Sequence, residues 1–80
     1  MNKFNKKFDF FEQLKQSYPE LTRSSRKICD YLLENAAKAQ YLSISSLAKE
    51  CNVAEATIFR FCKTMGFEGY NELKIALAKA

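Results

Sequence analysis

The sequence predicts an all-α fold of about five short helices, arranged as one domain. Apolar residues recur three and four positions apart along most of the chain, which is the spacing of amphipathic helices, and no segment alternates as a β-strand does. Only two glycines and one proline occur in 80 residues, too few for a fold built of hairpins. We therefore expect a single helical domain over residues 1–80, with the polar and basic residues 1–7 frayed.

Charge and cysteine content narrow the possible functions. Thirteen Lys and Arg against nine Asp and Glu give a net charge of +4, which is compatible with a polyanionic partner but does not demand one. The three cysteines lack the C-x-x-C spacing of zinc sites and no histidine is present, so we expect no metal site and no cofactor. We interpret the cysteines as small buried residues in a reducing compartment. No apolar run approaches the ~20 residues that span a membrane, so we expect a cytoplasmic protein without a membrane partner.

Three helices are expected before the centre of the chain. The apolar spacing predicts a first helix over residues 8–18, which Pro19 ends because the residue before a proline disfavours helix. Thr22 is placed to cap a second helix that ends near Asn35. Good helix formers over residues 36–41 predict one further short helix.

The N-terminal half has two features with alternative interpretations. Five aromatic residues precede Pro19, namely Phe4, Phe8, Phe10, Phe11 and Tyr18, and a basic cluster of Arg23, Arg26 and Lys27 begins the second helix. The aromatic residues either cover the core or form a partner surface, most simply for a second copy of the chain. The basic cluster is either a solvated face or a contact to phosphate or an acidic partner. We expect a weak homodimer in which the first helices of two copies meet.

The stretch from Ser43 to Met65 predicts a helix-turn-helix. Ser43 can cap the first helix, and the second helix runs over residues 54–64. Asn52 stands at the turn position that usually needs a positive φ, which asparagine tolerates better than most residues. The residues that match the spacing of the motif are Leu47, Ala48, Asn52, Val53, Ile58 and Phe61. The alternative is an ordinary helical hairpin, but the second helix also carries a free, partly basic face of the kind that enters the major groove of DNA.

On that free face, Arg60 is the best candidate for reading a base, because its guanidinium can donate two bonds to guanine O6 and N7. Lys63 either reaches a phosphate or is a solvated lysine, and Phe59 packs either on thymine methyls or at the edge of the core. Glu55 either accepts from cytosine N4 or suits the helix N-terminus. The full set predicted to contact DNA is Ser43, Ser45, Ser46, Glu55, Ala56, Thr57, Phe59, Arg60 and Lys63.

The chain after the motif predicts one more helix and no β-hairpin wing. Gly66 is placed as the left-handed stop of the second motif helix. A last helix follows over residues 70–79, with Tyr70, Leu73 and Leu77 inward. Ile75 lies off that stripe, so a further contact is possible there.

Two segments, LTRSSRKICDYLLEN and LSISSLAKECNVAEATIFRFCKTMGFEGYNELK, resemble the N-terminal domain of RpiR-type regulators. The resemblance spans about residues 21–77 and is most specific over residues 55–74. It implies a homeodomain-like DNA-binding domain of a bacterial transcription factor, with Ala56, Thr57, Arg60 and Lys63 facing DNA. The sequence departs from the family at Ala54, usually Ser, and at Asn52, often Gly.

The resemblance also implies that an effector-binding sugar-isomerase-like (SIS) domain, absent from these residues, binds phosphosugars and controls sugar-catabolism genes. We therefore predict a domain that binds double-stranded DNA in the bacterial cytoplasm, at the nucleoid when bound to its operator. The 80 residues contain no histidine, no paired carboxylates and no phosphate-cradling glycine loop, so we expect no enzyme. The alternative is a helical protein-interaction module that does not read DNA.

Overall fold

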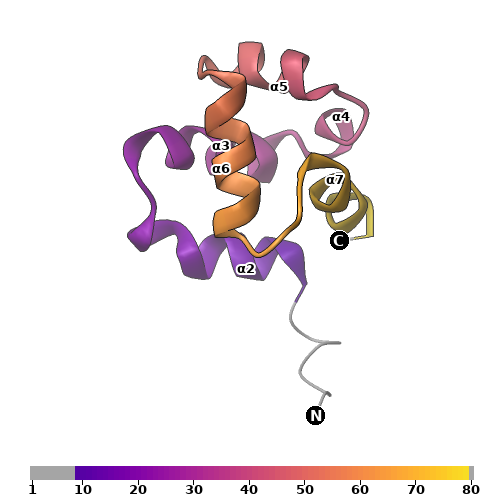
Figure 1. The fold of residues 1–80 in the computed structure, drawn as a ribbon. Helices are drawn as coiled ribbons and strands as arrows, with labels where there is room; N and C mark the ends of the chain where they lie inside the picture. Colours follow the sequence, from indigo (N-terminus) through magenta and orange to yellow (C-terminus); the bar gives the residue numbers. More distant parts are fainter. Residues whose placement is uncertain (1–8, 80) are drawn as a thin grey trace.

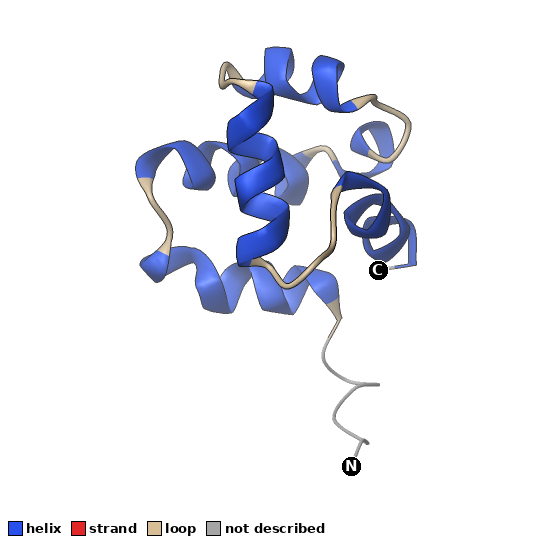
Figure 2. Ribbon diagram, in the orientation of Figure 1, coloured by secondary structure: helices blue, strands red, loops and turns tan. Residues whose placement is uncertain are grey.

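The computed structural model describes residues 9–79, and within this range every regular element is helical (Figures 1 and 2). The predicted all-α class is confirmed, and residues 9–79 contain six α-helices and one 3₁₀ helix, where about five helices were expected over the chain. The elements are α2 (Phe10–Ser17), η1 (Tyr18–Glu20), α3 (Arg23–Glu34), α4 (Ala36–Ala39), α5 (Ile44–Cys51), α6 (Glu55–Thr64) and α7 (Tyr70–Lys79).

Short polar side chains fix where three of the helices begin. Asp9 Oδ1 accepts the amide of Glu12 at 3.0 Å, and this cap starts α2 at Phe10 rather than two residues earlier as the sequence predicted. Thr22 Oγ1 accepts the amide of Ser25 at 3.2 Å at the start of α3, which confirms the predicted cap. The side chain of Ser43 caps α5 in the same way, by accepting the amide of Ser46. These local signals were readable from the sequence, except for Asp9.

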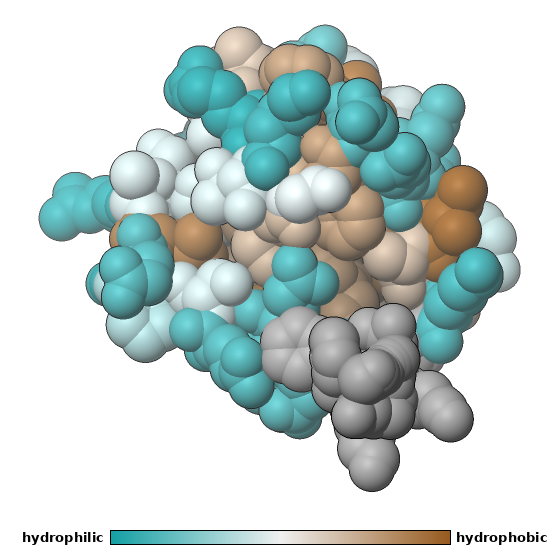
Figure 3. Space-filling model, turned by 60° about the horizontal axis from the view of Figure 1, so that its bottom comes forward, coloured by the Kyte–Doolittle hydropathy of each residue, from teal (hydrophilic) through white to brown (hydrophobic). Residues whose placement is uncertain are grey.

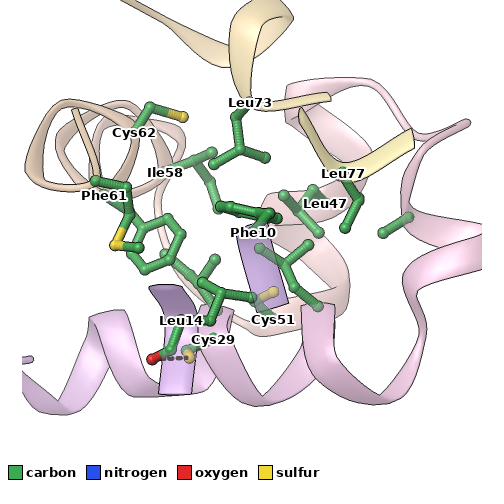
Figure 4. Packing of buried hydrophobic residues seen from close by; sticks show 14 of the residues in the cluster. Phe10, Leu14, Cys29, Leu47, Cys51, Ile58, Phe61, Cys62, Leu73 and Leu77 are labelled. Atoms are coloured by element: carbon green, nitrogen blue, oxygen red, sulfur yellow. Dashed lines mark hydrogen bonds between the residues drawn. The ribbon is translucent and has the colours of Figure 1, made fainter. Parts of the chain in front are cut away.

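The core lies where α6 crosses between α2, α3, α5 and α7, and Figure 4 shows side chains from these helices pointing into one cluster. Phe61 is its largest fully buried side chain. On α2 the buried pair is Phe10 and Leu14, whereas Phe11 on the same helix and Tyr18 in η1 are only partly buried. The inward face of α2 therefore runs along Phe10 and Leu14, which stand four residues apart.

Phe10 belongs to the core and not to a partner surface. Its side chain is 5% exposed, and its ring meets Phe67 edge-on, with centroids 5.6 Å apart and planes at 70°. The prediction that Phe10 pairs two copies of the chain is wrong, because the ring already fills the space between α2 and the segment after α6. Phe4 and Phe8, which shared that prediction, lie outside the described residues.

Arg26 holds the turn between α2 and α3. Its Nε donates to the carbonyl of Tyr18 at 3.1 Å and its Nη2 to that of Pro19 at 3.0 Å, with the guanidinium 5.1 Å from the centre of the Tyr18 ring. The Tyr18 hydroxyl in turn donates to Asp30 at 3.2 Å. The interpretation of Arg26 as part of a solvated or phosphate-binding cluster is wrong, since this side chain caps the carbonyls of η1. Arg23 and Lys27 remain exposed.

Two long-range hydrogen bonds position the C-terminal half. Gln13 Nε2 of α2 donates to the carbonyl of Met65 at 2.8 Å, just after α6. The hydroxyl of Tyr70, on α7, donates to the carbonyl of Leu42 at 2.7 Å, just before α5. Burial raises the pKa of Tyr70 from 10.0 to about 12, so this hydroxyl keeps its proton further into the alkaline range than an exposed tyrosine does.

Candidate nucleic-acid interface

The turn between α5 and α6 is a Schellman motif centred on Asn52. The backbone of Asn52 is left-handed (φ 59°, ψ 49°), and its amide donates to the carbonyl of Lys49 at 3.1 Å. The amide of Val53 reaches back to the carbonyl of Ala48 at 3.0 Å. The predicted positive φ at this position is confirmed. The motif closes two free carbonyls of α5 and turns the chain into α6 within three residues.

The C-terminal end of α6 also closes with a Schellman motif. Gly66 has φ +94°, and its amide donates to the backbone carbonyl of Lys63 at 2.9 Å. The amide of Phe67 donates to the backbone carbonyl of Cys62, also at 2.9 Å. The predicted stop at Gly66 is confirmed. The turn that leads into α6 and the turn that follows it are therefore both fixed by backbone hydrogen bonds.

The two faces of α6 separate as the sequence predicted. Ile58, Phe61 and Cys62 are completely buried, because α6 packs against α3, α5 and α7 (Figure 1). The opposite face is open: Glu55, Ala56, Phe59, Arg60 and Lys63 are exposed and Thr57 is half-buried. The core side thus holds α6 in place while these six side chains remain available to a ligand.

Side chains on the open face form two pairs. Arg60 Nη2 donates to Thr57 Oγ1 at 3.3 Å, and the Lys63 ammonium lies 5.6 Å from the centre of the Phe59 ring. Phe59 is 47% exposed, so it is not a core residue, although a cation over its face offsets part of the cost of leaving it in water. The result is a short row of two cations restrained by two neighbours one turn away.

The predicted serine cluster lies at the other end of α5, next to α4 (Figure 1). Ser43 Oγ accepts the amide of Ser46 at 3.0 Å and donates to Ser46 Oγ at 3.1 Å, so this hydroxyl is already occupied in capping. Ser45 and Ser46 are exposed. Since α5 is eight residues long, about 12 Å separates this cluster from the turn at Asn52. The structure therefore forms two groups, the α6 face and the serines, at opposite ends of α5.

The three thiols are structural. Cys29, Cys51 and Cys62 are buried, and burial raises the pKa of each to about 11, so they stay protonated at neutral pH. Over residues 9–79, no group of three or more His, Cys, Asp or Glu side chains could hold a metal ion. In the same range, no helix is long and apolar enough to cross a membrane.

Gln13 is the positioning residue that the sequence did not reveal. Its bond to the Met65 carbonyl joins residues 52 positions apart, and nothing in the local pattern around a polar residue on α2 indicates such a partner. The ion pair between Lys38 and Glu50, with Nζ and Oε1 3.8 Å apart, was equally unpredicted and joins α4 to α5 on the surface.

Comparison with known proteins decides the family. The helix-turn-helix domain of the rpiR family matches residues 8–80. This chain belongs to the rpiR family of helix-turn-helix domains. The family predicted from the sequence is thereby confirmed.

Among similar proteins, the transcriptional regulator HexR of Pseudomonas aeruginosa is 39% identical over 72 residues, which are 90% of this chain and 25% of HexR. The structure of Vibrio vulnificus NanR in complex with ManNAc-6P superimposes with a TM-score of 0.84 at 35% identity, over 86% of this chain and 26% of NanR. The N-terminal domain of the transcriptional regulator ybbH from Bacillus subtilis gives a TM-score of 0.81 at 28% identity, over 85% of this chain and 83% of that domain. The rpiR-family chain described here thus spans about a quarter of the length of HexR and NanR.

Proposed function

We propose that this domain reads a specific duplex DNA sequence by placing α6 in the major groove. The observation that carries the proposal is the division of α6, whose core side is fixed by three helices while Arg60 and Lys63 stand restrained on its open side. A helix of this width fits the major groove, where base edges are distinguishable. Membership of the rpiR family supports the same assignment.

Within this interface the side chains have different tasks. Arg60 donates to guanine O6 and N7, and its bond to Thr57 holds the guanidinium close to the helix before DNA arrives. Lys63 neutralises a phosphate, and Phe59 packs on a thymine methyl or a sugar. The small side chain of Ala56 allows the backbone of α6 to approach the DNA closely. Ser45 and Ser46, with the amides at the start of α5, contact the phosphates of one strand, while Ser43 holds those amides in place.

The first test is the salt dependence of DNA retention. Each phosphate that a Lys or Arg neutralises releases a counterion, so affinity should fall steeply as salt rises. A flat dependence, or no retention on any duplex at low salt, would contradict the proposal and favour a protein-interaction module.

The second test separates base reading from phosphate contact. Arg60→Ala should cost about 1–3 kcal/mol on the operator and relax specificity at one position, whereas Lys63→Ala should weaken binding to operator and random duplex alike. Lys15→Ala is the matched control, because Lys15 is exposed on α2, a helix that carries none of the predicted DNA contacts. Equal losses for Arg60→Ala and Lys63→Ala on both DNAs would refute the assigned roles.

For the longer protein, we propose regulation of sugar or phosphosugar metabolism genes in the bacterial cytoplasm, with the effector bound outside these 80 residues. NanR, a structural neighbour, is complexed with ManNAc-6P, and this chain corresponds to 26% of it. Calorimetry of the 80-residue chain with a panel of phosphosugars should show no saturable binding. One stoichiometric isotherm would place the effector site within this domain.

We also propose that two copies act together on DNA. One recognition helix contacts only a few base pairs, and factors of this kind gain selectivity by pairing across half-sites about one DNA turn, ~34–36 Å, apart. The surface through which they pair is a separate question, since Phe10 is part of the core.

A further inference from the structure

Tyr41, in the turn between α4 and α5, leaves its aromatic ring in water. Among the described residues three large apolar side chains are exposed, and Tyr41 at 82% is more exposed than Ile75 at 55% or Phe59 at 47%. On the face of the molecule seen in Figure 3, hydrophilic side chains surround the apolar surface, which gathers in the middle and at the right-hand edge. The ring of Tyr41 packs on almost nothing in the domain, so both the ring and its hydroxyl are free to contact a ligand.

The backbone that carries this ring is fixed by hydrogen bonds. The amide of Tyr41 donates to the carbonyl of Lys38 at 3.1 Å, and the amide of Leu42 donates to that of Ala39 at 3.0 Å. The side chain of Leu42 packs against the core, and its carbonyl accepts the hydroxyl of Tyr70 from α7 at 2.7 Å. Tyr41 is therefore a free side chain on an ordered turn, and little backbone freedom is lost when the ring is bound.

This turn leads directly into the serines that we assign to the phosphates. Tyr41 stands two residues before Ser43, the cap of α5, so their Cα atoms are at most about 7 Å apart. Figure 1 shows the turn at the edge of the molecule, where α4 passes into α5. One strand of DNA carries a phosphate about every 3.4 Å along the helix axis, so a group at this distance meets the same strand within about two nucleotides.

The charge around Tyr41 suits a polyanion. No acidic residue stands between Glu34 and Glu50, whereas Lys38 and Lys49 both lie in that stretch. Lys49 is exposed, and the ammonium of Lys38 lies 3.8 Å from the carboxylate of Glu50. The segment from α4 to the serines thus places no negative charge of its own against a phosphate.

We propose that Tyr41 contacts the DNA backbone beside the serines, with its hydroxyl donating to a phosphate oxygen and its ring packing on the adjoining deoxyribose. The inference rests on the proposed placement of α6 in the major groove, and it extends the contacts along the strand that Ser45 and Ser46 touch. Tyrosine suits this place because one end of its side chain is apolar and the other is polar. The contact involves no base edge, so it strengthens binding to every duplex and leaves sequence discrimination to Arg60.

Retention of Tyr41 variants on a random-sequence duplex tests the contact. Tyr41→Phe removes only the hydroxyl and should weaken binding roughly tenfold, because a hydrogen bond to a charged group is lost. Tyr41→Ala should weaken it further, because the ring is lost as well. The slope of affinity against salt should stay that of the wild type, since a neutral hydroxyl releases no counterion, whereas Lys63→Ala should lower the slope by about one. The urea midpoint should not move, because the side chain is exposed.

Ile75→Ala is the matched control, since Ile75 is an exposed apolar residue on α7, which carries none of the predicted DNA contacts, and this variant should bind like the wild type. Tyr41 variants that also bind like the wild type, while Lys63→Ala binds less tightly, would overturn the inference and leave the proposed function standing. A wild type that no duplex retains would overturn both. A loss confined to the operator would overturn the assignment of Tyr41 to the backbone.

Ethylation interference on the operator locates the contact. An ethyl group on a contacted phosphate hinders binding, so the wild type should show hindered positions for the serines and a further one within about two nucleotides of them. That further position should disappear with Tyr41→Phe while the others remain. The same pattern for both proteins would refute a bond from the Tyr41 hydroxyl to phosphate.

Discussion

Replacing Phe10 should unfold much of the domain, although the residue lies far along the sequence from the helix-turn-helix. Phe10 is 5% exposed and packs edge-on against Phe67, which follows the recognition helix α6. Truncating a buried Phe to Ala costs about 3–5 kcal/mol through lost transfer energy and the cavity left behind. The free energy of unfolding of a domain is ~0.05–0.15 kcal/mol per residue, which gives only about 4–12 kcal/mol for 80 residues. Phe10→Ala should therefore remove about a quarter or more of the free energy of unfolding.

Urea unfolding followed by circular dichroism measures this loss. With an m-value of about 1–1.5 kcal/mol/M, the midpoint of Phe10→Ala should fall by ~2–3 M or more. Phe11→Ala is the control, because the neighbouring ring is only partly buried and should cost less than half as much. Phe10→Asp should leave no folded domain, since it also buries an unpaired carboxylate. A loss below about 1 kcal/mol for Phe10→Ala, or equal losses at the two positions, would refute the assignment of Phe10 to the core.

Three further changes test the turn, the cap and the thiols. Ala54 precedes α6 with extended backbone (φ −78°, ψ 155°), and its side chain does not cap the helix. Ala54→Ser should therefore raise the free energy of unfolding by about 1 kcal/mol. If a urea titration shows no gain, the geometry at this position does not suit a serine cap. Asn52 is left-handed, so Asn52→Ala should lower stability by ~1 kcal/mol while Asn52→Gly should not, and equal melting of both variants would argue against strain at the turn. Burial raises the pKa of Cys29, Cys51 and Cys62 from 9.0 to about 11. The thiols of the unfolded chain therefore lose their protons at lower pH than those of the folded chain, and the free energy of unfolding should fall as the pH rises from about 9 toward 11. The fall is up to ~1.4 kcal/mol for each thiol and each unit of pKa shift. Urea midpoints at pH 7, 9 and 10 measure that fall, and midpoints that do not move would contradict it.

Features encoded by neighbouring residues were predictable from the sequence. Thr22 and Ser43 cap their helices through amides three residues away, and Asn52 and Gly66 adopt positive φ because the chain must leave a helix at each of them. The division of α6 into a core face and an open face follows from the 3.6-residue period alone. The exposed face of α6 was therefore predicted correctly from the sequence.

Features that depend on distant partners were not predictable. Phe10 is buried and Phe11 is left at the edge of the core, and the ring that Phe10 packs against is that of Phe67, more than 50 residues later. The sequence indicated that Arg26 is a surface cation, because its partners, two backbone carbonyls of η1, depend on how the chain turns before α3. Several inward faces were possible for an aromatic-rich helix of eight residues, and only tertiary packing chose among them.

The position of the recognition helix depends on both of its ends, and α2 controls one of them. Asn52 fixes where α6 begins, while Gln13 and Phe10 of α2 hold the segment from Met65 to Phe67 where it stops. Two helices joined by a turn cannot do this alone, because isolated helices of eight and ten residues are marginal in water and their apolar faces need a further layer. A change on α2 can therefore alter DNA binding without any contact to DNA, by letting the C-terminal end of α6 move. Gln13→Ala isolates this effect, since it removes one hydrogen bond to the Met65 carbonyl and leaves the apolar core unchanged.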